Sequence, residues 1–290
     1  MADAPDMPAL PTPAVNPFDS ELAVRHSQYF YTTDGRPVSR GGSDHTPDLF
    51  ASTAVAAFRG FVQNPQFSCV GAKSAVATDS ARLGVYDVLG SDEATAGLAR
   101  DLWTFTRDPK SHSDDDFVTF IAMFKEPTDL GEGKFEDRLW QQLQRLNRLD
   151  APHYAWDPTV SPDTDDPHFG FSFAGTAFFV VGLHPHSSRE ARRFPWPLLA
   201  FNPHAQFLRL REAGQWQRMQ EVIRTKEMSL QGSLNPNLAE HGSETEARQY
   251  SGREVEPNWH PPFDAQSPGP PPGPASGGCP FVHHPPEKSQ

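Results

Sequence analysis

The chain has 290 residues and carries 37 acidic against 25 basic side chains, giving a formal net charge of −12 at pH 7. This acidic excess disfavours a nucleic-acid-binding protein, which needs basic side chains against phosphates, and it disfavours docking on an anionic membrane. Two cysteines supply no disulfide framework and favour a reducing compartment. No apolar run approaches the roughly 20 residues of a membrane-spanning helix, and the N-terminus lacks a signal-peptide pattern, so we expect a cytoplasmic protein.

Proline is concentrated at the two ends of the chain. Five of the 30 prolines fall in residues 1–17, and eleven fall in residues 257–290. The stretch 267–278 is a Pro/Gly/Ser sequence of low complexity that cannot bury a hydrophobic core. We therefore predict a disordered arm over 1–17, one folded domain over 18–263, and a disordered tail over 264–290 that is dispensable for folding.

Helical and strand patterns alternate inside the folded domain. In its first half, apolar spacing predicts helices over 46–63 and 91–106, and Ser91 is a suitable N-cap for the second. Apolar runs predict strands over 83–88 and 117–124, the latter almost entirely apolar and therefore central in a sheet.

The second half of the domain continues this alternation. Leucine and phenylalanine at spacings of three to four residues predict a helix over 134–147. Three further strands are expected, at 169–174, 176–184 and 197–201. The sequence therefore predicts an α/β fold of the mixed α+β kind, a single domain in which helices flank a central mixed sheet.

Two capping patterns predict where helices begin near the end of this sheet. Ser187, with Glu190 three residues later, matches a capping box. A short helix there is expected to carry Arg189, Arg192 and Arg193. Asn202 followed by Pro203 matches an N-cap with proline at the first helical position. Helices are expected from there to 213–214 and from 215 to about 230.

The predicted strand 176–184 ends in coordinating side chains. It runs into His184-Pro185-His186-Ser187-Ser188-Arg189, which puts imidazoles and a guanidinium at the rim of a hydrophobic core. A metal or metal-containing cofactor needs nitrogen donors, dry walls and a rigid support. Because His204 also follows an apolar strand, His184 and His204 are expected on one rim. The alternative interpretation is an ordinary strand and polar turn, in which His184 simply caps the sheet.

Arginines near this rim suit a cofactor that carries carboxylates. If a haem is bound there, its propionates can pair with Arg189, Arg192 or Arg193, because a guanidinium binds carboxylates bidentately. Alternatively, Arg192 and Arg193 form a solvated helix face. Arg211 is expected to be exposed and unrelated to a cofactor. Cys69 is interpreted as a buried small hydrophobic residue, with thiolate ligation as the minor alternative.

Several strings of this sequence resemble the YqcI/YcgG family over roughly residues 45–263. The stretch from His184-Pro185 to Asn202-Pro203-His204 is long enough to be specific. The matching strings are Cys69–Ala75, Phe171–Pro185, Ser187–Arg189, Ala191–Phe194, Phe201–Phe207, Leu230–Pro236 and Gln249–Arg253.

The characterised proteins that this chain resembles are haem-dependent enzymes that N-hydroxylate guanidino compounds, such as arginine, in specialised-metabolite pathways. The resemblance implies b-type haem, dioxygen and an external electron donor, either a redox partner or a small reductant. We therefore expect 18–263 to be a haem-binding catalytic domain, with His184, Ser188, Arg189, Arg193, His204 and Lys73 as the cofactor-binding residues. We expect His184 to be the axial iron ligand, with His204 as the next candidate and Cys69 as the minor alternative.

A guanidinium substrate is cationic, so its pocket needs a carboxylate. Asp157, in Trp156-Asp157-Pro158, and Glu126, after the central strand, are the candidates; the alternative for each is an ordinary turn or surface acid.

One departure from the family pattern concerns the string Trp-x-Cys-Pro-Phe near the C-terminus. Residues 258–263 lack its cysteine, and Cys279-Pro280-Phe281 follows only after the Pro/Gly-rich stretch, so Cys279 is not expected to be a ligand.

Two alternative functions use some of the same residues. A haem-binding or gas-sensing protein without turnover needs the axial histidine but no substrate carboxylate. A non-haem iron oxygenase would use His184, His186 and His204 together with a carboxylate.

Overall fold

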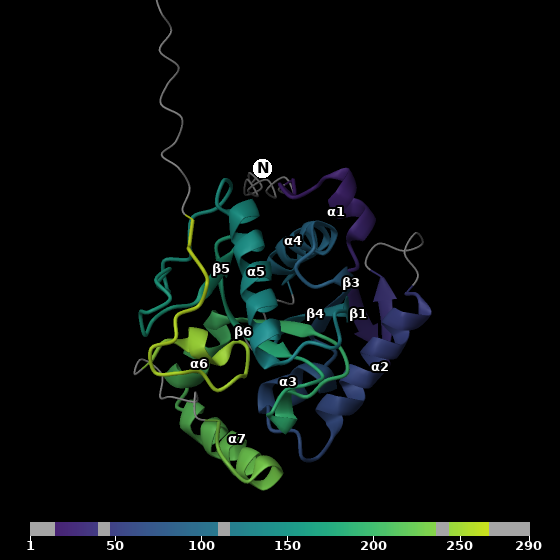
Figure 1. Cartoon of the computed structure of the whole chain (residues 1–290). Helices are drawn as coiled ribbons and strands as arrows, with labels where there is room; N and C mark the ends of the chain where they lie inside the picture. Colours follow the sequence, from purple (N-terminus) through teal and green to yellow (C-terminus); the bar gives the residue numbers. More distant parts are fainter. Residues whose placement is uncertain (1–14, 40–46, 110–116, 236–243, 267–290) are drawn as a thin grey trace, which may run out of the picture.

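The computed structural model describes residues 15–39, 47–109, 117–235 and 244–266. In these residues seven strands form one mixed sheet in the order β2-β1-β3-β4-β7-β6-β5, with helices on both faces (Figure 1). The predicted α/β domain with a central mixed sheet is therefore confirmed. The strands are β1 (Phe30–Thr33), β2 (Arg36–Ser39), β3 (Ala81–Val88), β4 (Thr119–Glu126), β5 (Phe171–Phe173), β6 (Thr176–Leu183) and β7 (Leu198–Pro203).

The helices lie between these strands and at the end of the domain. They are α1 (Glu21–His26), α2 (Leu49–Gln63), α3 (Val70–Ala77), α4 (Asp92–Thr106), α5 (Glu132–Asp150), α6 (His204–Glu212) and α7 (Trp216–Gln231), with short 3-10 turns η2 (Glu190–Arg192) and η3 (Glu246–Gln249). None of the described helices has both the length and the apolar character needed to cross a membrane.

Only one pair of neighbouring strands in the sheet is parallel. β3 and β4 run side by side in the same direction, whereas β4, β7, β6 and β5 pair successively in antiparallel fashion. On the other side, β1 pairs antiparallel with both β2 and β3. The central strand β4 therefore joins a parallel pair to an antiparallel half, and the antiparallel half carries the site described below.

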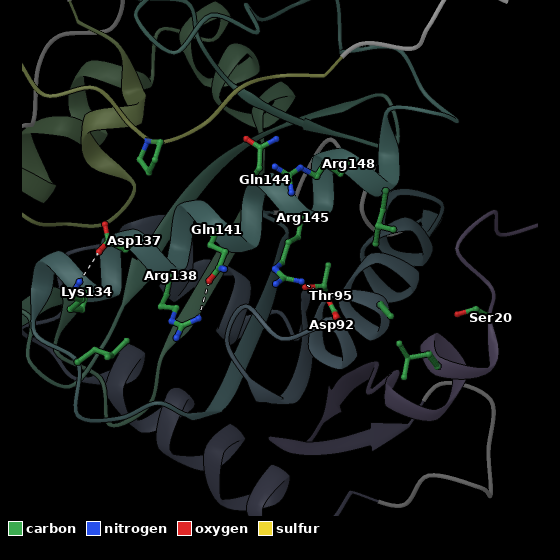
Figure 2. A pocket seen from close by; sticks show the side chains of 15 residues that line it. Ser20, Asp92, Thr95, Lys134, Asp137, Arg138, Gln141, Gln144, Arg145 and Arg148 are labelled. Atoms are coloured by element: carbon green, nitrogen blue, oxygen red, sulfur yellow. Dashed lines mark hydrogen bonds and ion pairs between the residues drawn. The ribbon is translucent and has the colours of Figure 1, made fainter. Parts of the chain in front are cut away.

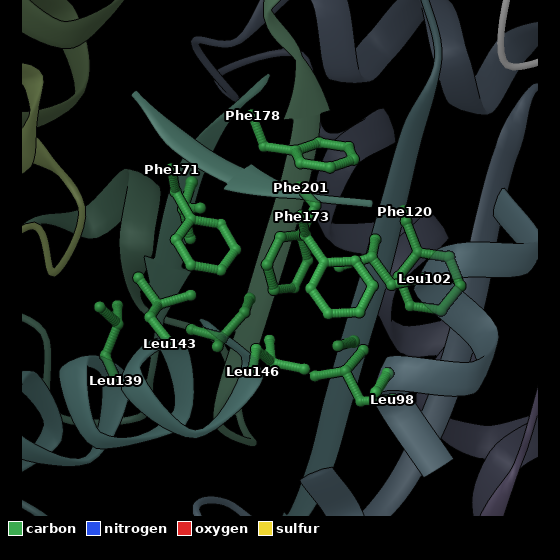
Figure 3. Close-up of a cluster of buried hydrophobic side chains, with 14 of the residues drawn as sticks. Leu98, Leu102, Phe120, Leu139, Leu143, Leu146, Phe171, Phe173, Phe178 and Phe201 are labelled. Carbon is green, nitrogen blue, oxygen red and sulfur yellow. The ribbon is translucent and has the colours of Figure 1, made fainter. Parts of the chain in front are cut away.

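Alternation along β4 divides the interior into two cores. Phe120, Ala122 and Phe124 face α4 and α5, whereas Ile121 and Met123 face α2 and α3. Such alternation is what a strand buried on both faces requires, because successive side chains point to opposite sides. The phenylalanines of four strands meet the leucines of α4 and α5 in the first core (Figure 3). Nearly all of the predicted leucine and phenylalanine stripe on α5 is fully buried there.

Most predicted elements agree with the structure to within a few residues, but both capping patterns near β6 and β7 were wrong. Asn202 belongs to β7, where its Nδ2 donates to the carbonyl of Phe179 at 3.0 Å, and α6 begins only at His204. Ser187 does not cap a helix, because its Oγ accepts from the backbone N–H of Arg189, and only a single 3-10 turn follows. In both places tertiary hydrogen bonds replace the expected helix cap.

The described chain continues past the predicted boundary of the folded domain. Residues 264–266, assigned to the tail from composition, lie along α5. The side-chain amide of Gln144 makes paired hydrogen bonds with the backbone of Asp264, and Asn147 does the same with Gln266. Most of the predicted arm and tail, including Cys279-Pro280-Phe281, lies outside the described residues.

These contacts predict different consequences for two truncations. A chain ending at Gln266 should unfold in urea at the same midpoint as the full chain. A chain ending at Phe263 loses the four hydrogen bonds to α5. Each contributes about 0.5–1.5 kcal/mol net, and water replaces part of it, so we expect the free energy of unfolding to fall by about 1–3 kcal/mol. Equal stability of the two truncated chains would contradict this assignment.

Candidate functional site

The two histidines expected on one rim lie at opposite ends of the sheet. β6 and β7 are antiparallel, with Phe178 opposite Pro203 and Leu183 opposite Leu198. His184 therefore follows the end of β6 beside the start of β7, and His204 follows the other end. Five residues of strand separate these ends by roughly 17 Å. The prediction of a shared rim was wrong, because it assumed that the two strands end at the same edge of the sheet.

His184 belongs to the hydrophobic core and not to a cavity. It is 1% exposed, and its ring stacks on Phe135 at 4.3 Å between centroids. Burial lowers its pKa to about 4, although Glu132 and a hydrogen bond with the Leu130 backbone act in the opposite direction. Nδ1 has no hydrogen-bond partner among the described residues. The structure thus favours the interpretation of His184 as a neutral imidazole at the end of the strand.

The predicted propionate-binding arginines are engaged in protein contacts. Arg189 is buried and binds Glu227 at 3.0 Å and the carbonyl of Ser233 at 2.8 Å. Arg192 donates to backbone carbonyls and does not form a solvated face. Arg193 is more exposed and pairs with Glu190 at 2.7 Å. These side chains tie η2 to α7 and to neighbouring loops, in the vicinity of His184.

The remaining predicted residues either contact other parts of the protein or are exposed. Asp157 accepts from the backbone of Thr159 and Ala177, so it anchors a loop to β6. Glu126 is exposed at the end of β4. Three more predicted or considered residues lie elsewhere: Ser188 donates to Glu132, Lys73 donates to the carbonyls of Asn64 and Pro65, and His186 is exposed.

A cavity of about 210 Å³ lies at the other end of the sheet, where His204 is. It is lined by residues of α3, α6, α7 and β6, by the start of β4 and by the end of β7. Its apolar walls include Phe179, Phe207, Trp216, Met219 and Ile223. The cavity meets β4 at its first residues, so Glu126 at the last residue of β4 is about 24 Å of strand away.

Cys69 also lines this cavity but is not the buried residue expected from the sequence. It is exposed, and its Sγ accepts from the backbone N–H of Ala72 at 3.4 Å as the N-cap of α3. The hydroxyl or carboxylate oxygen usual at an N-cap is thus replaced by a weaker sulfur acceptor.

His204 is part of a buried hydrogen-bonded chain at the cavity wall. Its Nε2 lies 2.9 Å from Oε2 of Glu246, and the hydroxyl of Tyr250 lies 2.8 Å from Oε1 of the same carboxylate. All three side chains are largely buried. Because an ionised carboxylate can only accept, Nε2 carries a proton, and in the neutral ring Nδ1 keeps a lone pair that can bind a metal.

Arg211 brings an unpaired positive charge to the same cavity. Its guanidinium lies over the indole of Trp216 at 4.7 Å, while Nε and Nη1 are buried without a hydrogen-bond partner among the described residues. Burial lowers the pKa of Arg211, and the charge of Glu246 partly offsets this. The expectation of an exposed Arg211 was therefore wrong.

The donor chemistry of this cavity fits a haem. It offers one imidazole, a carboxylate behind that imidazole and apolar walls, and an iron porphyrin needs only one protein donor of this kind. The space of about 210 Å³ suits a ligand of amino-acid size, so a macrocycle requires more room than the walls leave. The wall suited to yield is α7, none of whose residues is buried.

A non-haem iron centre is less consistent with this arrangement. Such a centre needs several protein ligands around one ion, but His184 and His204 are separated by the length of β6. In the part of the chain that the structure describes, no three His, Cys, Asp or Glu side chains gather in a way that could hold a metal ion.

A second hollow, of about 1210 Å³, lies on the outer side of α5 (Figure 2). Its charged side chains largely satisfy one another: Lys134 pairs with Asp137, and Arg145 pairs with Asp92. Arg138 donates to Gln141 at 2.9 Å. The polar groups of this hollow resemble a solvated surface and carry no buried, unpaired donor comparable to Arg211.

The sequence contained a signal for the residues that were missed, which are Phe207, Arg211, Glu246 and Tyr250. Phe207 and Arg211 follow His204 at i+3 and i+7, which places them on the same face of α6, and all three line the cavity. Glu246 precedes Tyr250 by four residues, a spacing that brings side chains together on a helical turn. Polar residues on an apolar stripe are the recognisable pattern.

Comparisons with known proteins agree with the residues quoted above. The model of the YqcI/YcgG family matches residues 58–264. An uncharacterized protein from Bacillus subtilis (strain 168), YqcI, is 26% identical over 200 residues, which cover 66% of this chain and 77% of that protein. No solved structure matches the chain.

The buried, neutral state of His184 predicts a pH dependence of stability. Its folded pKa of about 4 lies below the ordinary value of 6.5, so its contribution is fully present above pH 6.5 and is lost as the pH falls towards 4. The difference in unfolding free energy between wild type and His184→Gln should shrink by about 1–2 kcal/mol over that range, allowing for residual access of water. Urea unfolding at several pH values measures it, with His186→Gln as the exposed control.

Proposed function

The chain belongs to the YqcI/YcgG family, and from this membership and the cavity we propose that it is a haem-dependent monooxygenase. The substrate class that we propose is arginine or an arginine-like amino acid, N-hydroxylated at the guanidino group in specialised metabolism. The observation that carries the proposal is the buried pair of His204 and Glu246 at the wall of an apolar cavity. Among the candidate ligands, His204 thus takes the place first expected for His184.

Each group at the cavity has a role in this proposal. His204 would hold the iron of b-type haem, while Glu246 fixes the tautomer and orientation of the ring and raises its basicity. Tyr250 holds Glu246 in place from the other side. The bound haem would supply activation of dioxygen, with electrons from an external redox partner or small reductant. The apolar walls exclude water from the reacting nitrogen.

A carboxylate at the cavity suits the guanidinium of the substrate better than either acid expected from the sequence. Glu244 lines the cavity and is about half exposed, and its nearest ion-pair partner is Arg248 at 3.5 Å. A contact of that length is weak, so Glu244 can turn to a planar guanidinium. Asp157 and Glu126 are replaced in this role, because one anchors a loop and the other lies at the far end of β4.

Two further parts of the proposal rest on composition. The net charge of −12 supports the absence of nucleic-acid and anionic-membrane partners, and the two cysteines support a cytoplasmic location. A haem-binding sensor without turnover is the second candidate, since it uses His204 in the same way. The cavity also holds a cationic side chain and carboxylates beside this histidine. A gas sensor needs no such charged groups, so their presence favours the enzyme.

The assignment of the ligand is tested with protein expressed in the presence of a haem precursor. His204→Ala should lose most of its haem, measured as the Soret absorbance per protein, whereas His184→Ala should retain it when folded. Glu246→Gln should keep haem but lower its affinity roughly 10- to 100-fold, as expected when the partner of a ligating histidine is changed. Normal haem content in His204→Ala together with its loss in His184→Ala would reverse the assignment.

Turnover is tested separately. Anaerobic addition of L-arginine, followed by a reductant and air, should yield a product one oxygen atom heavier by mass spectrometry. A folded, haem-loaded protein that modifies neither L-arginine nor close guanidino analogues would favour the sensor.

A further inference from the structure

The charge of Arg211 has no counter-ion of its own in the cavity. Apart from the histidine, Arg211 is the one cationic side chain among the described residues that line it. Both oxygens of Glu246 are already engaged, one by His204 and the other by Tyr250. Glu244 forms its ion pair, a long one of 3.5 Å, with Arg248 and not with Arg211. Nε and Nη1 of Arg211 are buried without a partner, which is costly for a charged group. A ligand that supplies the missing anion would explain this arrangement.

The guanidinium is held in a fixed position by apolar contacts. Arg211 is the eighth residue of α6, and the central carbon of its guanidinium lies 4.7 Å from the ring centroid of Trp216, the first residue of α7. Each of the two edges of a guanidinium that can bind a carboxylate bidentately includes Nε or Nη1, and both atoms are unpaired among the described residues. The contact with the indole restricts the rotation of the side chain.

We propose that Arg211 binds the carboxylate of a small amino-acid ligand and thereby makes the cavity selective for such ligands over their decarboxylated analogues. This inference deepens the proposed function and rests on it for the identity of the reaction, but the binding itself does not depend on haem.

The composition of the cavity favours a monocarboxylate over a phosphate. A phosphate carries close to two negative charges and three acceptor oxygens, and one arginine between two glutamates would satisfy it poorly. A ligand with one carboxylate and one cationic group matches both signs of charge present, because Arg211 takes the first and the carboxylate of Glu244 the second. Without haem, the volume of about 210 Å³ limits such a ligand to the size of a single amino acid.

The experiment compares binding of matched pairs by calorimetry to the full-length protein, with and without haem. The pairs are L-arginine with agmatine, L-lysine with cadaverine, and 4-guanidinobutyrate with propylguanidine. Wild type should bind the carboxylate of at least one pair about 10- to 100-fold more tightly than its partner, as expected for charge-assisted hydrogen bonds. Arg211→Gln should abolish that preference and leave the thermal midpoint unchanged or higher. The exposed Arg218→Gln on α7 is the matched control and should behave like wild type.

Two results would overturn the proposal. No preference for the carboxylate in any pair by wild type would exclude carboxylate recognition in the cavity, whatever the protein does with haem. Loss of haem in Arg211→Gln with an unchanged preference would assign Arg211 to a haem propionate instead. Failure of turnover, with the preference present in wild type and absent from Arg211→Gln, would leave this inference standing and reject only the proposed reaction.

Discussion

The antiparallel pairing of β6 with β7 is the constraint on which the site depends. Its register sends His184 to one end of the sheet and His204 to the other, so one histidine enters the core and the other reaches a cavity. Alternation along β6 has a second consequence: Phe178 and Val180 face the main core, while Phe179 and Val181 face the cavity. A slip of one residue would exchange these faces and bury the wrong side of the strand.

A chain of buried polar groups then fixes what the cavity can do. The hydroxyl of Tyr250 lies 2.8 Å from Glu246 and also accepts from the backbone N–H of Phe171 at 3.1 Å. Burial and the neighbouring Glu246 raise the pKa of Tyr250 well above its usual value, so its proton stays on the oxygen. The carboxylate is therefore held from one side by a phenol and from the other by His204, and such a satisfied network holds an imidazole in a defined orientation.

Local elements were predictable from the sequence, but their relative arrangement was not. The stripe on α5 and the apolar runs of β4 and β6 depend on periodicity, which neighbouring residues determine. The direction in which β6 and β7 pair depends on contacts between segments distant in sequence, and the error about His184 and His204 came from that gap. Arg211 was misjudged for a related reason: its burial arises from α7 and Trp216, which a helix pattern alone cannot position.

The direct passage from β7 into α6 links the two halves of the site. Since α6 begins at the residue after β7, the end of the strand sets the direction of the first helical turn. His204, Phe207 and Arg211 then follow on one face over two turns, an advance of about 10 Å along the helix axis. The imidazole of His204 and the unpaired guanidinium of Arg211 are thereby carried on a single rigid support. This geometry allows one ligand atom to be held near His204 while a carboxylate is bound by Arg211, with α7, none of whose residues is buried, as the wall between cavity and solvent.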